Sequence, residues 1–129
     1  MDSQDLKTHQ WKNRVILILS NDAENQAYKT QINDLKNSSE GCAERKLLMY
    51  QVLPNQVTTH HFKGDKRKPS PSSSDLYKEF MSASDSFKMI LIGLDGGIKE
   101  KRNEPISSKE LFAIIDGMSM RQAEIRKNN

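Results

Sequence analysis

The feature that most constrains the fold is the continuous apolar run at positions 15–19, Val-Ile-Leu-Ile-Leu. A run of β-branched and aliphatic residues without polar alternation is typical of a strand buried on both faces, as in parallel sheets. A second run of strand type covers residues 47–53 and is stopped by Pro54. The distance between the two runs leaves room for a crossover helix, so the sequence predicts a right-handed βαβ unit with parallel strands.

The crossover segment carries a helix signal of its own. Asn21 and Glu24 have the spacing of a capping box, which predicts that the helix begins at this point. Three apolar side chains then follow at spacings of four and three, on one helical stripe: Tyr28, Ile32 and Leu35. We expect this helix to end by Gly41.

The C-terminal half predicts a hairpin followed by a helix. Residues 87–93 form a third apolar run, residues 95–97 (Asp-Gly-Gly) supply a tight turn, and residues 98–102 return as a fourth strand. Ser107 and Glu110 form a capping box directly before a helical apolar stripe.

A short helix at residues 75–82 completes the pattern. The resulting order is β-α-β-α-β-β-α, which predicts a thioredoxin-like α/β fold with a four-stranded mixed sheet and helices on both faces.

The length of 129 residues suits one domain. We expect a polar leader at residues 1–10, a mobile loop at 55–74 and a tail at 125–129. No run approaches the roughly 20 apolar residues of a membrane span. The leader has no signal-peptide core, so either the protein is cytoplasmic or a signal has been removed.

The charge balance gives little support to nucleic-acid binding. The chain has 20 Lys and Arg against 17 Asp and Glu, a net charge of +3, and the two signs alternate along most of the sequence. The segment 63–68, in which Lys66, Arg67 and Lys68 are consecutive, forms the exception. No aromatic side chains interleave these charges, and we interpret the segment as part of the loop. Binding of nucleic acid or an anionic surface there would show strong salt dependence.

The sequence predicts no catalytic residue, cofactor or metal. Thioredoxin chemistry needs a thiol at the N-terminus of the first helix, where positions 21–24 read Asn-Asp-Ala-Glu, so redox exchange is excluded at that site. The adjacent His60 and His61 lack any accompanying ligand motif and are interpreted as a solvated loop pair. The glycine-rich segment 93–97 joins two strands and lacks the residues of a phosphate-binding loop.

Cys42 is the only cysteine, so no intramolecular disulfide can form. It is either a small core residue or a reactive thiol, and the nearby Arg45 and Lys46 keep the second interpretation open.

The predicted topology brings three segments to one pole of the sheet: residues 11–14, 95–97 and 118–124. One interpretation is a protein- or peptide-binding surface, with Trp11 as apolar anchor and with Arg14, Asp95 and Arg121 as polar contacts. The other is structural: Trp11 covers the end of the sheet, and Arg14 pairs with an acidic residue (Glu124 or Asp116) to dock the last helix.

Five segments together resemble an uncharacterised thioredoxin-like family, sometimes called the DUDES-type domain: residues 11–14, 92–97, 104–105, 111–116 and 118–124. This family occurs as small, often exported bacterial proteins and as modules of vertebrate matrix proteins, including the sushi-repeat-containing proteins. Leu94 and Ser119 depart from its pattern, where lysine and proline are usual.

The resemblance implies the thioredoxin-like fold and a location outside the cytoplasm, but no activity. We therefore expect a non-catalytic interaction module with an unidentified protein or peptide partner. The alternative is a single-cysteine thiol enzyme or redox sensor that uses Cys42. The sequence does not indicate an oligomeric state.

Overall fold

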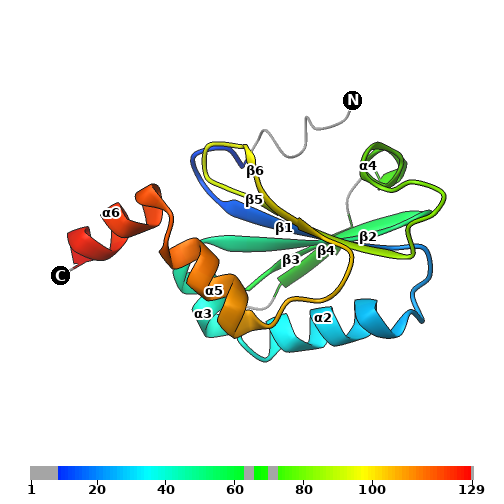
Figure 1. The fold of residues 1–129 in the computed structure, drawn as a ribbon, viewed down its shortest axis with the longest axis horizontal. Coiled ribbons are helices and arrows are strands. Elements are labelled where there is room, and N and C mark those ends of the chain that lie inside the picture. The colour runs from blue at the N-terminus through cyan, green and yellow to red at the C-terminus, as the bar shows by residue number, and fades with distance from the viewer. Residues whose placement is uncertain (1–8, 63–65, 70–72, 129) are drawn as a thin grey trace.

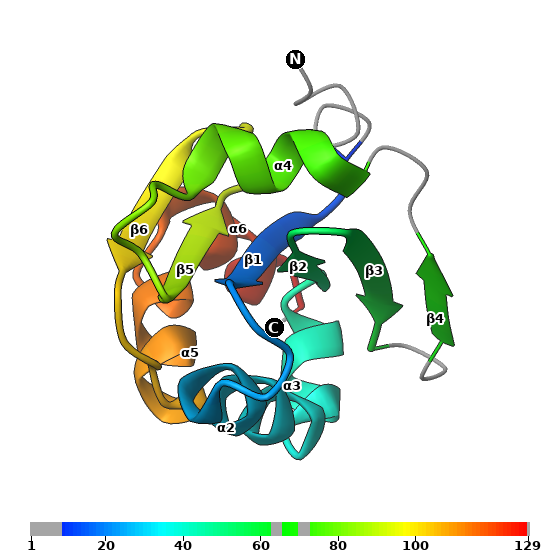
Figure 2. The same cartoon turned by 90° about the vertical axis from the view of Figure 1, so that its right-hand side faces the viewer.

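A computed structural model describes residues 9–62, 66–69 and 73–128. One six-stranded sheet lies between helices on both of its faces (Figures 1 and 2). The strands are β1 (Arg14–Ser20), β2 (Leu47–Leu53), β3 (Gln56–His61), β4 (Lys66–Pro69), β5 (Phe87–Ile92) and β6 (Ile98–Arg102). The helices are α2 (Gln26–Lys36), α3 (Ser39–Glu44), α4 (Ser73–Phe80), α5 (Ser108–Asp116) and α6 (Ser119–Asn128).

The sheet has the order β4-β3-β2-β1-β5-β6. β1 and β2 are parallel, with Val15 opposite Leu48, so the predicted βαβ unit is present. β5 pairs antiparallel with β1 on its other side, and β6 pairs antiparallel with β5. The predicted mixed sheet is confirmed, but the prediction of four strands is wrong.

The additional strands lie in the segment predicted as a mobile loop, residues 55–74. β3 pairs antiparallel with β2 across a tight connection at Pro54 and Asn55, and β4 pairs antiparallel with β3. In β3 only Val57 and His60 are buried, and the remaining side chains are polar, so the strand lacks the apolar run that marks β1. The basic residues 66–68 are therefore in a strand, whereas positions 63–65 and 70–72 lie outside the described residues.

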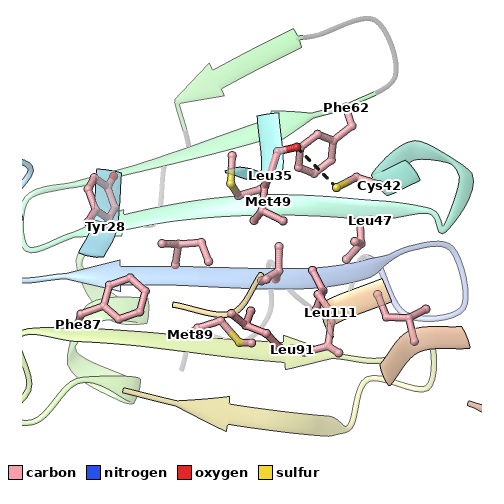
Figure 3. Close-up of a cluster of buried hydrophobic side chains, with 14 residues drawn as sticks. Tyr28, Leu35, Cys42, Leu47, Met49, Phe62, Phe87, Met89, Leu91 and Leu111 are labelled. Atoms are coloured by element: carbon pink, nitrogen blue, oxygen red, sulfur yellow. Dashed lines mark hydrogen bonds between the residues drawn. The ribbon is translucent and has the colours of Figure 1, made fainter. Parts of the chain in front are cut away.

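All seven residues of β1 are buried, because helices cover the sheet on both sides. Ile16 and Ile18 contribute to a core against α2, α3 and α5 (Figure 3), while Val15, Leu17 and Leu19 contribute to a second core beneath α4. The alternation of side chains along a strand explains this division. It also explains why the whole run must be apolar.

The first long helix begins later than the capping-box spacing predicts. Asp22 accepts a hydrogen bond from the backbone N–H of Glu24 at 3.0 Å, which makes a turn after β1. Asn25 is the N-cap of α2 and accepts from the N–H of Tyr28 at 3.1 Å. A separate short helix, α3, carries Cys42.

The C-terminal helix start was predicted correctly. Ser107 is the N-cap of α5 and accepts from the N–H of Glu110 at 3.1 Å. The chain then continues past Gly117 into α6, so the segment predicted as a tail, 125–129, is helical through residue 128. Residues 1–8 of the predicted polar leader lie outside the described residues. None of the helices described is both long and apolar enough to cross a membrane.

Candidate functional site

The segment before β1 is fastened to the β5–β6 hairpin. The backbone N–H of Trp11 donates to the carbonyl of Leu94 at 2.6 Å, and Nε2 of Gln10 donates to the carbonyl of Asp95 at 2.9 Å. Gly96 lies beside the Gln10 side chain and has φ of 84°, a conformation that favours glycine. The predicted proximity of residues 11–14 and 95–97 is therefore present in the structure.

A pocket of about 340 Å³ lies where this hairpin meets the start of β1 and the α5–α6 junction. It is lined by Arg14, Gly93, Leu94, Asp95, Lys99, Gly117, Met118 and Met120. All three segments expected at this pole thus meet. Arg14 and Asp95 line the pocket, whereas Trp11 and Arg121 are not among its lining residues.

The two large apolar side chains at this pole are exposed to solvent. Trp11 is 62% exposed and Met120 is 41% exposed. The structural interpretation expects the indole of Trp11 to cover the end of the sheet. Its exposure shows that it does not. Its backbone is nevertheless held at the pocket by the bond to Leu94.

Arg14, the first residue of β1, is completely buried. Its Nη1 donates to the backbone carbonyl of Arg45 at 2.8 Å and to Oε1 of Glu124 at 3.3 Å. Its Nε and Nη2 are also buried, but neither has a hydrogen-bond partner among the described residues. The pairing with Glu124 agrees with the structural interpretation, whereas the two remaining donors are not explained by it.

Arg121 forms the centre of the ion-pair network behind the pocket. It donates to Asp116 and to Glu44 at 3.0 Å each, and to Glu124 at 3.3 Å. Arg45 makes a bidentate contact with Asp116, with distances of 3.1 and 2.9 Å. These bonds link α3, α5 and α6. In this geometry Arg121 of α6 contacts carboxylates of α3 and α5.

The network changes the proton affinities of its members. Burial on its own would raise the pKa of Glu124, but Arg14, Arg121 and Lys46 hold that pKa below its usual range. Burial would also raise the pKa of Asp116, but its hydrogen bonds to Arg45 and Arg121 hold that pKa below its usual range. Both carboxylates therefore stay charged at neutral pH.

Asp95 holds the hairpin turn. Its Oδ1 accepts from the N–H of Gly97 at 2.9 Å, and its Oδ2 pairs with Lys99 at 3.0 Å. The bond from Gly97, followed by the bond from Lys99, lowers the pKa of Asp95. At the edge of the pocket, both oxygens of the Asp95 carboxylate therefore already have partners within the hairpin.

Cys42 lies in the core between α3 and the sheet (Figure 3) and is 0% exposed. Burial raises the pKa of its thiol to about 12, with opposing contributions from Arg45, which lowers it, and Asp34, which raises it. Its Sγ lies 3.8 Å from the carbonyl oxygen of Leu35. This environment favours the neutral thiol of Cys42 over the thiolate.

The histidine pair lies in β3, not in a loop. His60 is buried and its ring stands edge-on to Phe62, while His61 is half-buried. Within the described ranges, no three side chains of His, Cys, Asp or Glu are grouped so that they could hold a metal ion.

Sequence reasoning missed Lys99 and Met120 as pocket residues. Lys99 sits on a strand of charged residues with no pattern to single it out. Met120 follows directly after the α5 stripe, in the segment 118–124 that carries the family resemblance, and this was its only sequence signal.

The fold is similar to that of the solved structure of reduced 2-Cys peroxiredoxin from Plasmodium vivax. The two superpose with a TM-score of 0.61 over 92% of this chain and 83% of the other, with 17% sequence identity. At this identity the likeness shows the thioredoxin-like fold alone.

The sequence match is to a family without an assigned activity. Residues 5–124 match the family described as Domain of unknown function (DUF4174), which covers the whole sheet and all three segments around the pocket. The chain thus has the thioredoxin-like α/β fold and belongs to the DUF4174 family.

Proposed function

We propose that this domain is a non-catalytic, thioredoxin-like interaction module that binds a protein or peptide partner at the pole around the Arg14 pocket. The observation that carries the proposal is the pairing of exposed Trp11 and Met120 with a pocket that contains a buried arginine. Tryptophan and arginine contribute most to the binding energy of protein interfaces. The backbone hydrogen bond from Trp11 to Leu94 restrains the main chain there and so reduces the backbone entropy lost when a partner binds.

The motif resemblance extends the proposal. The resemblance to small exported bacterial proteins and to modules of matrix proteins would place the partner outside the cytoplasm. Thiol chemistry at Cys42 is the alternative function.

Selection of peptides from a random displayed library against the full chain tests the proposal. Affinities of the selected peptides are then measured by fluorescence anisotropy for the wild type and for Trp11→Ala, Met120→Ala and Ile32→Ala. Ile32 is a half-buried aliphatic residue on α2, which contributes nothing to the pocket, and serves as the control.

We expect Trp11→Ala and Met120→Ala each to weaken binding by about tenfold. Ile32→Ala should leave affinity within about twofold, because surface changes outside an interface have little effect on binding. Circular dichroism checks that all three variants fold. Failure to enrich any peptide, or peptides whose affinity depends on Ile32 and not on Trp11 and Met120, would contradict the proposal.

A further inference from the structure

We infer that the Arg14 pocket binds a carboxylate of the partner, next to an apolar side chain of that partner. The inference rests on the proposed function and specifies the chemistry that this pole recognises. A peptide carboxylate has two sources, the C-terminus and an acidic side chain, and both present the same pair of oxygens.

The first argument is the geometry of the unused donors. The Nε–H of a guanidinium and one N–H of Nη2 lie parallel on the same edge, and this edge matches the two oxygens of a carboxylate. In Arg14 the bonds to Arg45 and Glu124 both use Nη1. The edge formed by Nε and Nη2 is buried and has no hydrogen-bond partner among the described residues.

Burial makes these unused donors costly. A buried donor without a partner loses about 1–3 kcal/mol relative to a bonded one, and more when it is charged. Native proteins satisfy most such groups. Arg14 also lines a pocket of about 340 Å³. Because its side chain is 0% exposed, a ligand in this pocket supplies the missing acceptors only when the wall over the guanidinium moves aside.

The second argument is the local charge. Among the described residues, ion pairs connect Arg14, Arg45, Lys46 and Arg121 to three carboxylates, those of Glu44, Asp116 and Glu124. Among these described groups one positive charge is in excess. Asp95 does not offset it, because its carboxylate is paired with Lys99. The pocket therefore favours an anion over a neutral or cationic group.

The third argument is the composition of the walls. Leu94, Met118 and Met120 provide apolar surface, and methionine adapts to side chains of different shape. Lys99 also lines the wall, where its charge is paired with that of Asp95. A carboxylate adjacent to an aliphatic or aromatic side chain fits this combination better than a bare inorganic anion does.

The pocket is tested with small probes and the side-chain Nε–H resonances of ¹⁵N-labelled full-length protein. The probes are N-acetyl-leucine, its uncharged amide, N-acetyl-Asp-Leu amide and inorganic phosphate. N-acetyl-leucine offers a terminal carboxylate, and N-acetyl-Asp-Leu amide offers only a side-chain carboxylate. The Arg14 Nε–H signal, assigned with Arg14→Lys, reports binding at the unused edge.

We expect at least one carboxylate probe to shift the Arg14 signal with a dissociation constant in the millimolar range, and the leucine amide to bind at least about tenfold more weakly. The tighter of the two carboxylate probes identifies the source. Arg14→Lys should weaken binding, since lysine retains the charge but not the parallel donors.

A second pair of variants keeps the test decisive if Arg14→Lys does not fold. Met120 is exposed, so both Met120→Glu and Met120→Gln should fold. Met120→Glu places a competing carboxylate at the pocket and should weaken carboxylate binding by about tenfold relative to Met120→Gln.

The inference is overturned if neither carboxylate probe shifts Arg14, if the amide binds as well as the acid, or if phosphate binds as tightly as both. Selected peptides that still depend on Trp11 in those cases would leave the proposed function standing. Absence of both peptide and probe binding would remove the two together.

Discussion

Glu124 is the carboxylate that faces the buried guanidinium of Arg14. Its Oε1 accepts from Nη1 of Arg14 and Nη1 of Arg121, each at 3.3 Å, and Nζ of Lys46 lies 3.7 Å from its Oε2. A buried charge that loses its partner destabilises a protein strongly, because water cannot replace the lost interaction. Single residues in this network therefore affect the stability of the whole pole.

Glu124→Gln should lower the free energy of unfolding by about 2–3 kcal/mol at neutral pH, less than for a fully buried pair because Glu124 is partly exposed. The pKa of Glu124 is lowered in the folded state. Its stabilisation is thus fully present above its unfolded pKa of about 4.3 and is lost as the pH falls through the folded value.

Urea denaturation of wild type and variant between neutral and acidic pH measures this effect. The difference between them should shrink below about pH 4. Glu110→Gln is the control, since Glu110 pairs with Arg102 at an exposed position and its loss should matter little. A difference that stays constant down to acidic pH would show that charge is not its cause.

Cys42 should react slowly with iodoacetamide in the native protein at mildly alkaline pH. The thiol is fully buried and burial raises its pKa to about 12, so both access and thiolate formation are disfavoured. The urea-unfolded chain is the control and should react with a half-point near about pH 8.5. Fast native reaction with a half-point well below neutrality would instead support the alternative thiol function.

At the scale of elements, one side chain joins helix α2 to the segment before α5. Nε2 of Gln31 donates to the carbonyl of Ile106 at 3.0 Å, and Oε1 of Gln31 accepts from the N–H of Ile106 at 2.8 Å. All of these groups are buried. The amide therefore acts as a substitute for a backbone partner between two elements far apart in sequence.

Gln31→Met should lower the free energy of unfolding by about 2–4 kcal/mol, because it leaves both polar groups of Ile106 buried without partners. Gln26→Met is the matched control on the same helix. Gln26 is exposed, and among the described residues its side chain bonds only to Thr30, so its loss should cost under about 0.5 kcal/mol. Urea denaturation compares the two, and equal effects would contradict this role for Gln31.

At the scale of the whole molecule, stability is concentrated in the centre of the sheet. β1 is paired on both sides and covered on both faces, whereas β4 and β6 are the edge strands. The two cores share β1, β2 and β5, so disruption of either core exposes the same strands. The molecule should therefore unfold from its edges inward.

Amide hydrogen exchange followed by NMR tests this order. Amides of β1 and β5 should exchange only through global unfolding, while the outward-facing amides of β4 and β6 exchange through local opening at much lower free energy. The comparison is made within one protein at one pH. Uniform protection across all six strands would contradict a stable centre with weaker edges.

Much of the fold was predictable because its signals are local. The apolar runs of β1 and β2, the Asp-Gly-Gly turn before β6 and the Ser107 cap each depend on neighbouring residues alone. β3 and β4 were not predicted because their side chains are mostly polar. Pairing of β3 with β2, and of β4 with β3, makes them strands, not apolar content. The N-cap of α2 is Asn25 and not the predicted Asn21, because a turn that includes Asp22 and Glu24 lies between β1 and the helix.

The sequence by itself determined the parallel βαβ unit, the C-terminal hairpin and the helix after it, the absence of a cysteine pair and the pole at which three segments meet. Only the tertiary structure decided that Arg14 is buried with donors unused, that Trp11 is exposed and that Lys99 and Met120 complete the pocket. The physical reason is that backbone preferences act between near neighbours. The burial and pairing of Arg14, in contrast, depend on Arg45 and Glu124, which only folding brings beside it.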